Sequence, residues 1–410
     1  MSQKLVNALI AEMAKMQIID CHEHLHPEKS RVDSKVDAFT FFSHYTSGDI
    51  RVANLIGPRQ QDLLNHDIPL AKRWELFEPT WKQIRYTSYS RAALIALKKF
   101  YSADDFTADN VESISAAMNA ANTPGIYRRV LRDACNIKTS LTQCGQWDFG
   151  GDELMTPVMP LVWPEVESWR FVNRPLWEPD TSVETLDQYL AAKRRYVADM
   201  KSKGVVGLKT VAQPYKTPNR AEALAAFESL KNGSVERLPN VNPLRDYVVE
   251  QVIAMAAEAD MVVCVHTGYW GDFRDLSPAH MIPILQRNPN ARFDIYHVGY
   301  PYVREALMLG KGFHNVWTNF CWTHIISQKF ATDALDEAVD LLPANKLLAF
   351  GGDYGGIVEK VYGHLVMARE DIATVLARRI ENGQLSESAA IDLARRWFCD
   401  NPKELYRLKN

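Results

Sequence analysis

The distribution of apolar residues predicts short buried strands separated by amphipathic helices. Residues 3–16 place apolar side chains at helical spacing, and a short apolar run over 17–22 follows them. Further apolar runs predict strands at 137–142, 158–163, 204–211, 261–266, 291–297, 315–320 and 346–353. Helical periodicity falls mainly between them, at 183–203, 220–230, 243–259, 278–287, 302–309 and 331–342. Regular alternation of strand and helix is typical of a parallel sheet, and eight such units predict a closed (β/α)8 TIM barrel, in the α/β class.

One long segment departs from this alternation. Residues 30–136 are rich in aromatic residues, arginine and helical stretches such as 92–101 and 111–121, and they contain no run of strands. We therefore predict a single domain over residues 1–410, with a helical insertion at about 30–136 between the first two strands. The insertion would cover the barrel mouth or build a subunit interface. A doubly wound open sheet is the alternative fold, but no G-x-G-x-x-G turn follows the first strand.

Composition limits the kinds of partner and the cellular compartment that we expect for this protein. The net charge of -3 over 410 residues gives no reason to expect nucleic acid or an anionic membrane as a partner. No apolar run is long enough to cross a bilayer, and Glu12 and Lys15 interrupt the first helix, so it does not resemble a secretory signal. The six cysteines form no C-x-x-C pair, which predicts a reducing, cytoplasmic location without disulfides.

Polar side chains follow several of the predicted strands at the point where each strand ends. His22 and His24 end the first strand, and alternate residues of a strand face the same way. Three later strands end in His266, His297 and Asp353. Because the carboxyl ends of barrel strands meet at one mouth, these groups are expected to converge there. Imidazoles with one carboxylate predict a divalent metal site, for which zinc is favoured and manganese is the alternative.

This pattern resembles the amidohydrolase superfamily, and in particular its amidohydrolase-related branch (amidohydrolase 2) of metal-dependent TIM-barrel hydrolases. The resemblance rests on Asp20-x-His22-x-His24, His266, His297 and Asp353, and the branch is indicated by the segment from His297 to Pro301 followed by Asn315 and Val316. It implies one metal held by His22, His24, His266 and Asp353, with His297 and Asp353 catalytic.

Lys209, at the end of the fourth predicted strand, has three interpretations. The resemblance implies either an unmodified cation that faces a substrate carboxylate or a carboxylated lysine that bridges a second metal. A lysine that extends to solvent is the third. Arg274, Trp270 and Tyr354 complete the candidate substrate-binding set, although Arg274 could equally pair with Asp275 at the surface. Trp322, after the seventh strand, could wall the pocket.

The predicted function is a metal-dependent hydrolase. Metal-activated water would attack an ester, lactone or amide carbon of a small substrate that carries a carboxylate. The alternative on the same metal site is a non-oxidative decarboxylase or an enzyme similar to uronate isomerase. A degenerate barrel that only binds ligands is a third hypothesis, but it would have no need of the full ligand set. Such barrels are commonly oligomers, so a homo-oligomer is expected.

Overall fold

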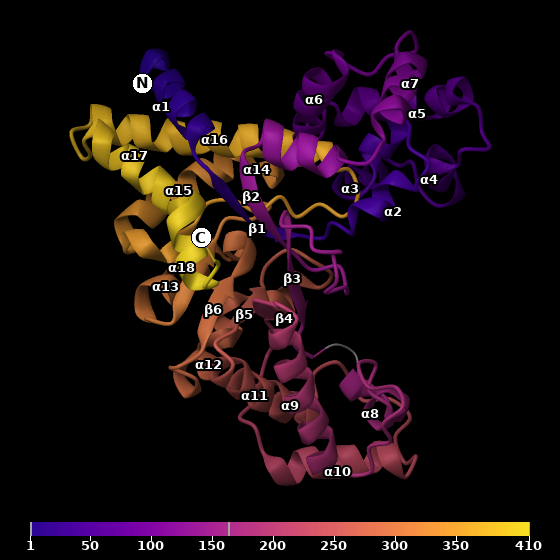
Figure 1. The fold of residues 1–410 in the computed structure, drawn as a ribbon, viewed down its shortest axis with the longest axis vertical. Coiled ribbons are helices and arrows are strands. Elements are labelled where there is room, and N and C mark those ends of the chain that lie inside the picture. The colour runs from indigo at the N-terminus through magenta and orange to yellow at the C-terminus, as the bar shows by residue number, and fades with distance from the viewer. Residues whose placement is uncertain (1, 163–164, 410) are drawn as a thin grey trace.

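The computed structural model describes residues 2–162 and 165–409, and within them eight parallel strands form one sheet in chain order (Figure 1). The strands are β1 (Ile18–Glu23), β2 (Ile137–Thr142), β3 (Met155–Pro160), β4 (Gly207–Val211), β5 (Val262–His266), β6 (Arg292–Ile295), β7 (Val316–Asn319) and β8 (Leu347–Leu348). Two backbone hydrogen bonds join the chain after β8 to β1. Cys21 N–H donates to Phe350 O at 2.9 Å, and Asp353 N–H donates to His22 O at 2.8 Å. The predicted (β/α)8 barrel is confirmed.

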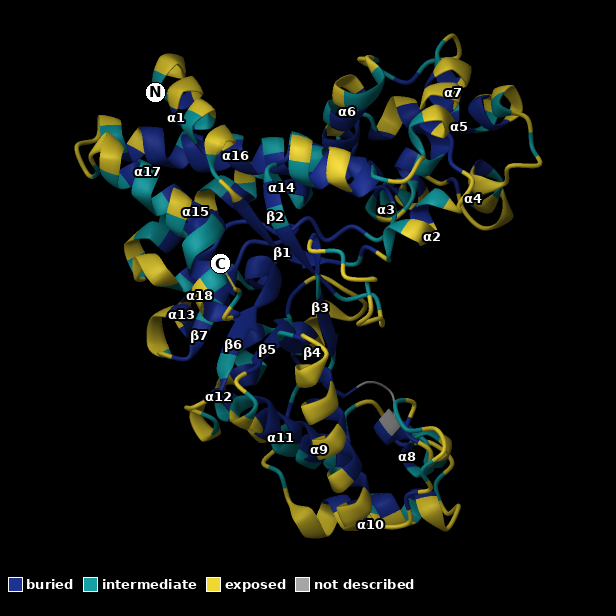
Figure 2. Ribbon diagram, viewed as in Figure 1, coloured by how far each residue is buried: buried dark blue, intermediate teal, exposed yellow. Residues whose placement is uncertain are grey.

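Helices follow the strands on the outside of this barrel (Figure 1). They are α1 (Gln3–Lys15), α8 (Trp169–Asn173), α9 (Leu186–Ser202), α10 (Arg220–Lys231), α11 (Pro243–Glu258), α12 (Ile282–Arg287), α13 (Val303–Gly312), α14 (Thr323–Ile326), α15 (Gln328–Leu341), α16 (Glu359–Glu381), α17 (Glu387–Arg395) and α18 (Asn401–Leu405). Several begin where the sequence supplies a capping side chain; Thr185 and Gln188, for example, cap α9 reciprocally. The strands are buried, and the helices expose one face to solvent (Figure 2).

Two strands depart furthest from the sequence-based boundaries. The strand predicted at 158–163 begins earlier, at Met155, and its predicted end at Trp163 lies outside the described residues. The last strand pairs with β7 over only two residues, and the chain beyond Leu348 forms a turn that also hydrogen-bonds with β1. Gly352 belongs to that turn, and a Cβ at this position would collide with the carboxylate of Glu23. This glycine therefore serves the close approach of two chain segments.

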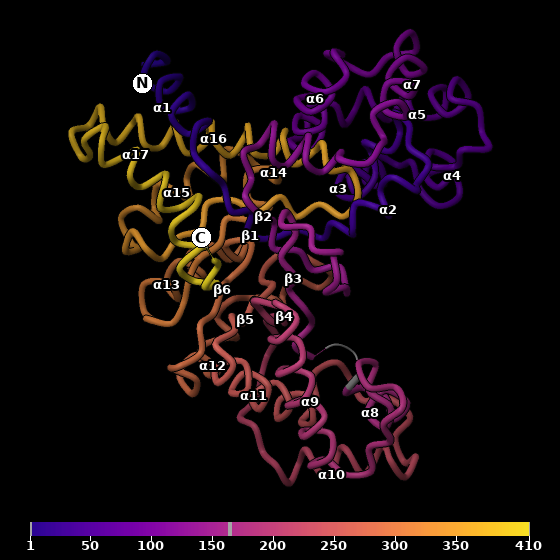
Figure 3. Tube along the Cα trace, in the orientation of Figure 1, coloured from indigo at the N-terminus to yellow at the C-terminus, as the bar shows by residue number. Residues whose placement is uncertain are grey.

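Between β1 and β2 the chain is helical and lies to one side of the barrel (Figures 1 and 3). Its helices are α2 (Glu28–Val32), α3 (Tyr45–Val52), α4 (Pro58–Gln61), α5 (Leu70–Ile84), α6 (Ser88–Tyr101) and α7 (Val111–Ala121). It has a hydrophobic cluster of its own, which includes Phe39, Phe42, Phe77 and Trp81. Lys360 of α16 ties the segment to the barrel by donating to Phe41 O at 3.0 Å and Ser43 O at 2.8 Å. The assignment of residues 1–410 to one domain stays a prediction.

No helix among the residues that the structure describes is long and apolar enough to span a membrane.

Candidate metal centre

The histidines and the aspartate that were singled out in the sequence lie together at the carboxyl ends of the strands. His22 belongs to β1, His266 ends β5 and His24 directly follows β1, whereas His297 and Asp353 lie in the segments that follow β6 and β8. His297 and Asp353 have left-handed backbone conformations, with φ of 66° and 60°. Non-glycine residues rarely adopt this conformation, and it is concentrated at functional sites.

The carboxylate of Asp353 is the centre of the cluster. Its Oδ1 lies 3.0 Å from His22 Nε2 and 3.3 Å from His24 Nε2, and its Oδ2 lies 3.8 Å from His297 Nδ1. His22, His297 and Asp353 each offer a ligand atom, and these atoms lie within 4.8 Å of one another. Two ligand atoms that are each about 2.1 Å from a tetrahedral zinc ion would lie about 3.4 Å apart. The spacing around Asp353 therefore fits a divalent metal.

Backbone carbonyls determine which nitrogen of two imidazoles carries the proton. His24 Nδ1 lies 2.7 Å from Gln143 O, and a carbonyl can only accept, so Nδ1 donates and Nε2 keeps a lone pair toward Asp353. His297 Nδ1 lies 3.4 Å from both the carbonyl oxygen and the Sγ of Cys321, and the carbonyl favours a proton on Nδ1, which leaves Nε2 as an acceptor. A carbonyl that orients a ligand histidine is a recurrent support in metal sites.

This arrangement also determines the state of His266. Its Nδ1 lies 3.0 Å from His297 Nε2, so Nδ1 donates and His266 Nε2 keeps the lone pair. That Nε2 is buried and has no hydrogen-bond partner among the residues that the structure describes. Burial lowers the pKa of His266 well below its usual range and that of His297 to about 4, so both rings are neutral at pH 7. The orphaned nitrogen fits a metal ligand.

Lys209 is buried in the same site. Its Nζ has no hydrogen-bond partner within the described chain and lies 3.8 Å from the ring centroid of Tyr296. Burial lowers the pKa of Lys209 to about 8. The side chain lines a cavity of about 330 Å³ together with His24, Trp270 and Asp353. A buried ammonium without a hydrogen-bond partner contradicts the solvent-facing interpretation and favours a negative group in the cavity.

The other predicted substrate-binding residues lie in different surroundings. Trp270 lines the cavity, with its ring 5.5 Å from that of His266. Tyr354 is buried behind the site, where its backbone N–H donates to Glu23 Oε2 at 2.7 Å. Arg274 has a side chain that is 81% exposed, and it pairs with Asp272 at 2.5 Å instead of the expected Asp275. Neither Tyr354 nor Arg274 lines the cavity, and their substrate contacts stay a prediction without geometric support.

The helical segment between β1 and β2 adds Tyr45, which sequence reasoning missed. The hydroxyl of Tyr45 donates to Asp353 Oδ2. Together with Tyr89 and Trp322 it lines an adjoining cavity of about 410 Å³, which shares His266 and Asp353 with the first one. Trp322 Nε1–H also donates to the hydroxyl of Tyr89 at 2.9 Å. Tyr45 lies at no strand end, so no sequence signal distinguishes it from the many aromatic residues around it.

Two buried carboxylates next to the site, Asp20 and Glu23, hold the surrounding chain segments in place. Asp20 Oδ1 accepts from the backbone N–H of Gly352 at 3.1 Å and of His22 at 3.3 Å. Burial raises the pKa of Asp20 to about 6 and that of its neighbour Glu23 well above its usual range. Asp20 thus joins the chain segments that carry His22 and Asp353, and it lines neither cavity.

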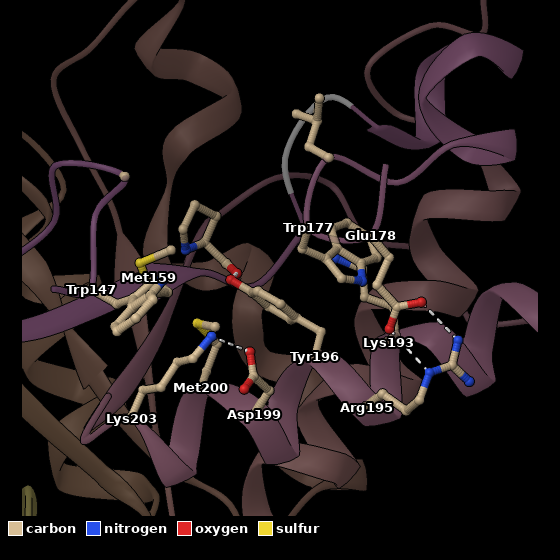
Figure 4. A pocket seen from close by; sticks show the side chains of 13 residues that line it. Trp147, Met159, Trp177, Glu178, Lys193, Arg195, Tyr196, Asp199, Met200 and Lys203 are labelled. Carbon is tan, nitrogen blue, oxygen red and sulfur yellow. Dashed lines mark hydrogen bonds and ion pairs between the residues drawn. The ribbon is translucent and has the colours of Figure 1, made fainter. Parts of the chain in front are cut away.

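A further cavity of about 590 Å³ lies beside α9, outside the barrel (Figure 4). Trp147, Trp177 and Tyr196 line it, and the Nζ of Lys193 lies 3.7 Å from the ring centroid of Trp177. Figure 4 shows the ion pairs Arg195–Glu178 and Lys203–Asp199 at its edge. None of the candidate metal ligands lines this cavity.

Comparison with known proteins shows similarity in sequence and in fold. A family model described as "Amidohydrolase" matches residues 173–408. Protein fluG of Emericella nidulans is 24% identical over 223 residues, which is 50% of this chain and 26% of that protein, so the match spans about a quarter of this relative. The uronate isomerase of Thermotoga maritima has a TM-score of 0.81 at 16% identity and covers 99% of this chain and 98% of its own.

Two further solved structures share the fold. The glucuronate isomerase of Caulobacter crescentus has a TM-score of 0.79 at 17% identity, and the match covers 99% of this chain and 94% of that one. A protein from Lactobacillus casei that is described as a metal-dependent hydrolase has a TM-score of 0.68 at 19% identity, with 97% of both chains covered. At these identities the likeness establishes the barrel fold.

Proposed function

Because the chain belongs to the amidohydrolase family, we propose that this enzyme is a metal-dependent hydrolase that cleaves an ester, lactone or amide bond. Its substrate is a small molecule that carries a carboxylate. The observation that carries the proposal is the position of Asp353, whose carboxylate faces His22 and His24 on one side and Tyr45 on the other, at the wall of both cavities. Homo-oligomer formation and a cytoplasmic location stay predictions.

The proposed metal ligands are His22, His24, His266 and Asp353. His24 and His266 each present an Nε2 lone pair, because hydrogen bonds at Nδ1 hold their protons on the other nitrogen. His297 uses both ring nitrogens in hydrogen bonds, which suits a residue that moves a proton more than a ligand. Neutral imidazoles and a carboxylate favour zinc, with manganese as the alternative. A bound divalent metal would lower the pKa of a coordinated water and polarise the scissile carbonyl.

The residues around the metal site have separate tasks. Asp353 accepts the proton of the attacking water and passes it to the leaving group, as a general base and then an acid. Tyr45 donates to Asp353 Oδ2 and so keeps Oδ1 directed toward the histidines. Lys209, a buried cation with no hydrogen-bond partner among the described residues, binds the substrate carboxylate. Trp270 and Trp322 exclude water from the cavity walls.

Isomerisation of a sugar acid is the second candidate. The hydroxyl of Tyr45 and the ammonium of Lys209 could serve an acid–base step and hold a carboxylate, respectively, without any attack by water. The uronate isomerase of Thermotoga maritima matches 99% of this chain, including the helical segment that carries Tyr45, and this likeness favours keeping the candidate. A decarboxylase would use the same metal site.

Product mass separates these reactions. The metal-loaded enzyme is incubated with a panel of small lactones, esters, amides and hexuronates, and the products are analysed by mass spectrometry. Hydrolysis adds one water to the substrate mass, isomerisation leaves the mass unchanged, and decarboxylation removes carbon dioxide. Turnover of a lactone, ester or amide with gain of water supports the proposal. Turnover of hexuronates alone, with unchanged mass, would refute it in favour of the isomerase.

Two variants link the turnover to the site. Asp353→Asn removes the general base and a ligand charge and should lower kcat/KM by a factor of about 10²–10⁴. Tyr45→Phe keeps the ring but removes the hydrogen bond to Asp353 and should lower kcat with little change in KM. Arg304→Gln, at a side chain that is 81% exposed and lines neither cavity, is the control and should retain wild-type turnover. Wild-type activity of Asp353→Asn would place the chemistry elsewhere.

A further inference from the structure

A cavity of about 620 Å³ lies at the end of the barrel opposite the candidate metal centre. Its wall includes Ile19, Lys138 and Thr156, which stand at the start of β1, β2 and β3, whereas the metal centre lies where the strands end. The end of α9 and the segment from Lys403 to Lys409 complete the wall. In Figure 3 the C-terminal end of the tube lies close to the barrel strands.

The side chains around this cavity are strongly basic. Six lining residues are cationic and one, Glu153, is acidic; the cationic ones are Arg132, Lys138, Lys201, Lys403, Arg407 and Lys409. Arg132 pairs with Glu153 at 3.1 Å, and Arg407 Nε lies 3.9 Å from Asp260 nearby. The chain as a whole has a net charge of -3, so this concentration of positive charge is local. Like charges that surround one space repel one another, and an anion between them relieves that repulsion.

Several of these cations are held in place by neutral groups. Lys138 Nζ donates to Lys409 O at 3.0 Å, Lys201 Nζ to Asp260 O at 3.2 Å, and Arg132 to Lys138 O at 3.0 Å. A backbone carbonyl orients a cation without cancelling its charge. Over residues 2–162 and 165–409, neither Lys403 nor Lys409 forms an ion pair.

The inner wall of the cavity is formed by Tyr406. This residue is 3% exposed, and its hydroxyl donates to Asp294 Oδ2 inside the barrel at 2.6 Å. It also lies 3.4 Å from the hydroxyl of Tyr296, whose ring is 4.4 Å from that of His22. The cavity is therefore closed from the metal centre by buried side chains, and it constitutes a separate site.

We propose that this basic cavity binds a small, multiply charged anion of the phosphate class, such as a polyphosphate or a phosphate ester. Its volume lies within the range of small-molecule sites, roughly 300–1,000 Å³. Arginine and lysine are the side chains that bind phosphate oxygens by charge-assisted hydrogen bonds. The concave wall, with cations from four separate chain segments, favours a compact anion over an extended polymer.

The test measures pyrophosphate binding to the metal-loaded full chain by calorimetry, with the thermal midpoint as a second readout. Lys403→Gln/Arg407→Gln removes two cations of the cavity. The matched control, Arg304→Gln/Lys329→Gln, removes two cations whose side chains are each 81% exposed, on α13 and α15. Asp353→Asn is the third variant, because pyrophosphate could also bind to a metal ion.

The proposal expects binding to wild type, to the surface control and to Asp353→Asn. The dissociation constant for Lys403→Gln/Arg407→Gln should be at least about tenfold higher. Pyrophosphate should also raise the thermal midpoint of wild type more than that of the cavity variant, because a ligand stabilises the state that binds it. No binding to wild type, equal binding to the cavity variant, or loss of binding only in Asp353→Asn would each overturn the proposal. None of these outcomes depends on which reaction the metal centre catalyses.

Discussion

At the scale of single residues, proton positions decide which nitrogen atoms can bind a metal. The carbonyls of Gln143 and Cys321 hold protons on Nδ1 of His24 and His297, and through His297 the same logic reaches His266. The result is a pair of Nε2 lone pairs, on His24 and His266, at the barrel mouth. In the proposed mechanism, two backbone carbonyls would separate a ligand role from a proton-transfer role among chemically identical side chains.

Asp294 gives a residue-scale prediction that is independent of the metal. It is fully buried on β6, and burial raises its pKa from 3.8 to about 7, against hydrogen bonds from Tyr406 and Asn319. Because the folded state binds this proton more tightly, its stabilising effect is complete below pH 4 and is lost as pH rises through about 7. Each pKa unit corresponds to about 1.4 kcal/mol, so the loss is on the order of a few kcal/mol.

Asp294→Asn should remove this dependence. We expect the free energy of unfolding, measured by urea denaturation, to fall less between pH 5 and pH 8 for the variant than for wild type. Both proteins contain the same metal ligands, so the titration of those ligands cancels when the two pH profiles are subtracted. Parallel pH profiles would show that Asp294 remains ionised throughout this range.

Single residues also show what a sequence can reveal about such a site. His22, His24, His266, His297 and Asp353 could be found because each lies at the end of an apolar run, and barrel topology brings those ends together. Tyr45 could not, because nothing in the helical segment indicates where its helices dock on the barrel. The carbonyl of Gln143 could not be singled out either, since every residue has a backbone carbonyl.

At the scale of elements, the contact between α6 and α16 positions the aromatic wall of the site. Gly363 of α16 packs directly on the backbone of Ala92 in α6, and a Cβ there would collide with the Ala92 carbonyl oxygen. One turn before Ala92, Tyr89 accepts the hydrogen bond of Trp322 and stacks on Tyr45 at 5.2 Å between ring centroids. A glycine on one helix thus sets the depth at which another helix presents its tyrosine.

Gly363→Ala should therefore disturb both stability and the pocket. Overpacking at a close helix contact costs about 1–3 kcal/mol, so we expect a lower thermal midpoint together with reduced turnover. Gly312→Ala, at the last residue of α13, is the matched control because a Cβ there meets no atom within 4 Å. An unchanged midpoint for Gly363→Ala would mean that α6 can shift away from α16 at no cost.

Element boundaries were less predictable than element types. The alternation of strand and helix predicted the order of β1 to β8, but β8 has only two residues where the sequence suggested eight. An apolar run indicates burial, and the stretch after Leu348 is buried between β1 and the segment after β7: Cys21 N–H donates to Phe350 O and Trp322 N–H donates to Gly351 O, both at 2.9 Å. Periodicity carries no information about which neighbour a buried segment pairs with.

At the scale of the whole molecule, the proposed metal site joins the first and last strands of the barrel. His22 and His24 come from β1 and its end, Asp353 follows β8, and His266 ends β5 on the far side of the ring. The backbone link between β1 and the segment after β8 consists of a few hydrogen bonds, among them Cys21 to Phe350. Through Tyr45, the carboxylate also holds the helical segment against the barrel mouth. A metal at this point would connect three parts of the chain.

Removal of the metal should therefore lower the stability of the entire fold. A ligand present at one hundred times its dissociation constant stabilises the folded state by about 2.7 kcal/mol, and tighter binding adds more. We expect dipicolinate treatment to lower the thermal midpoint in calorimetry and added zinc to restore it, whereas Asp353→Asn should respond to neither. Elemental analysis of the same samples gives the metal content. One equivalent per chain agrees with an unmodified Lys209, and two equivalents would indicate a carboxylated Lys209 that bridges a second ion. A wild-type midpoint indifferent to chelation, in protein shown to lose its metal, would contradict a metal that closes the barrel.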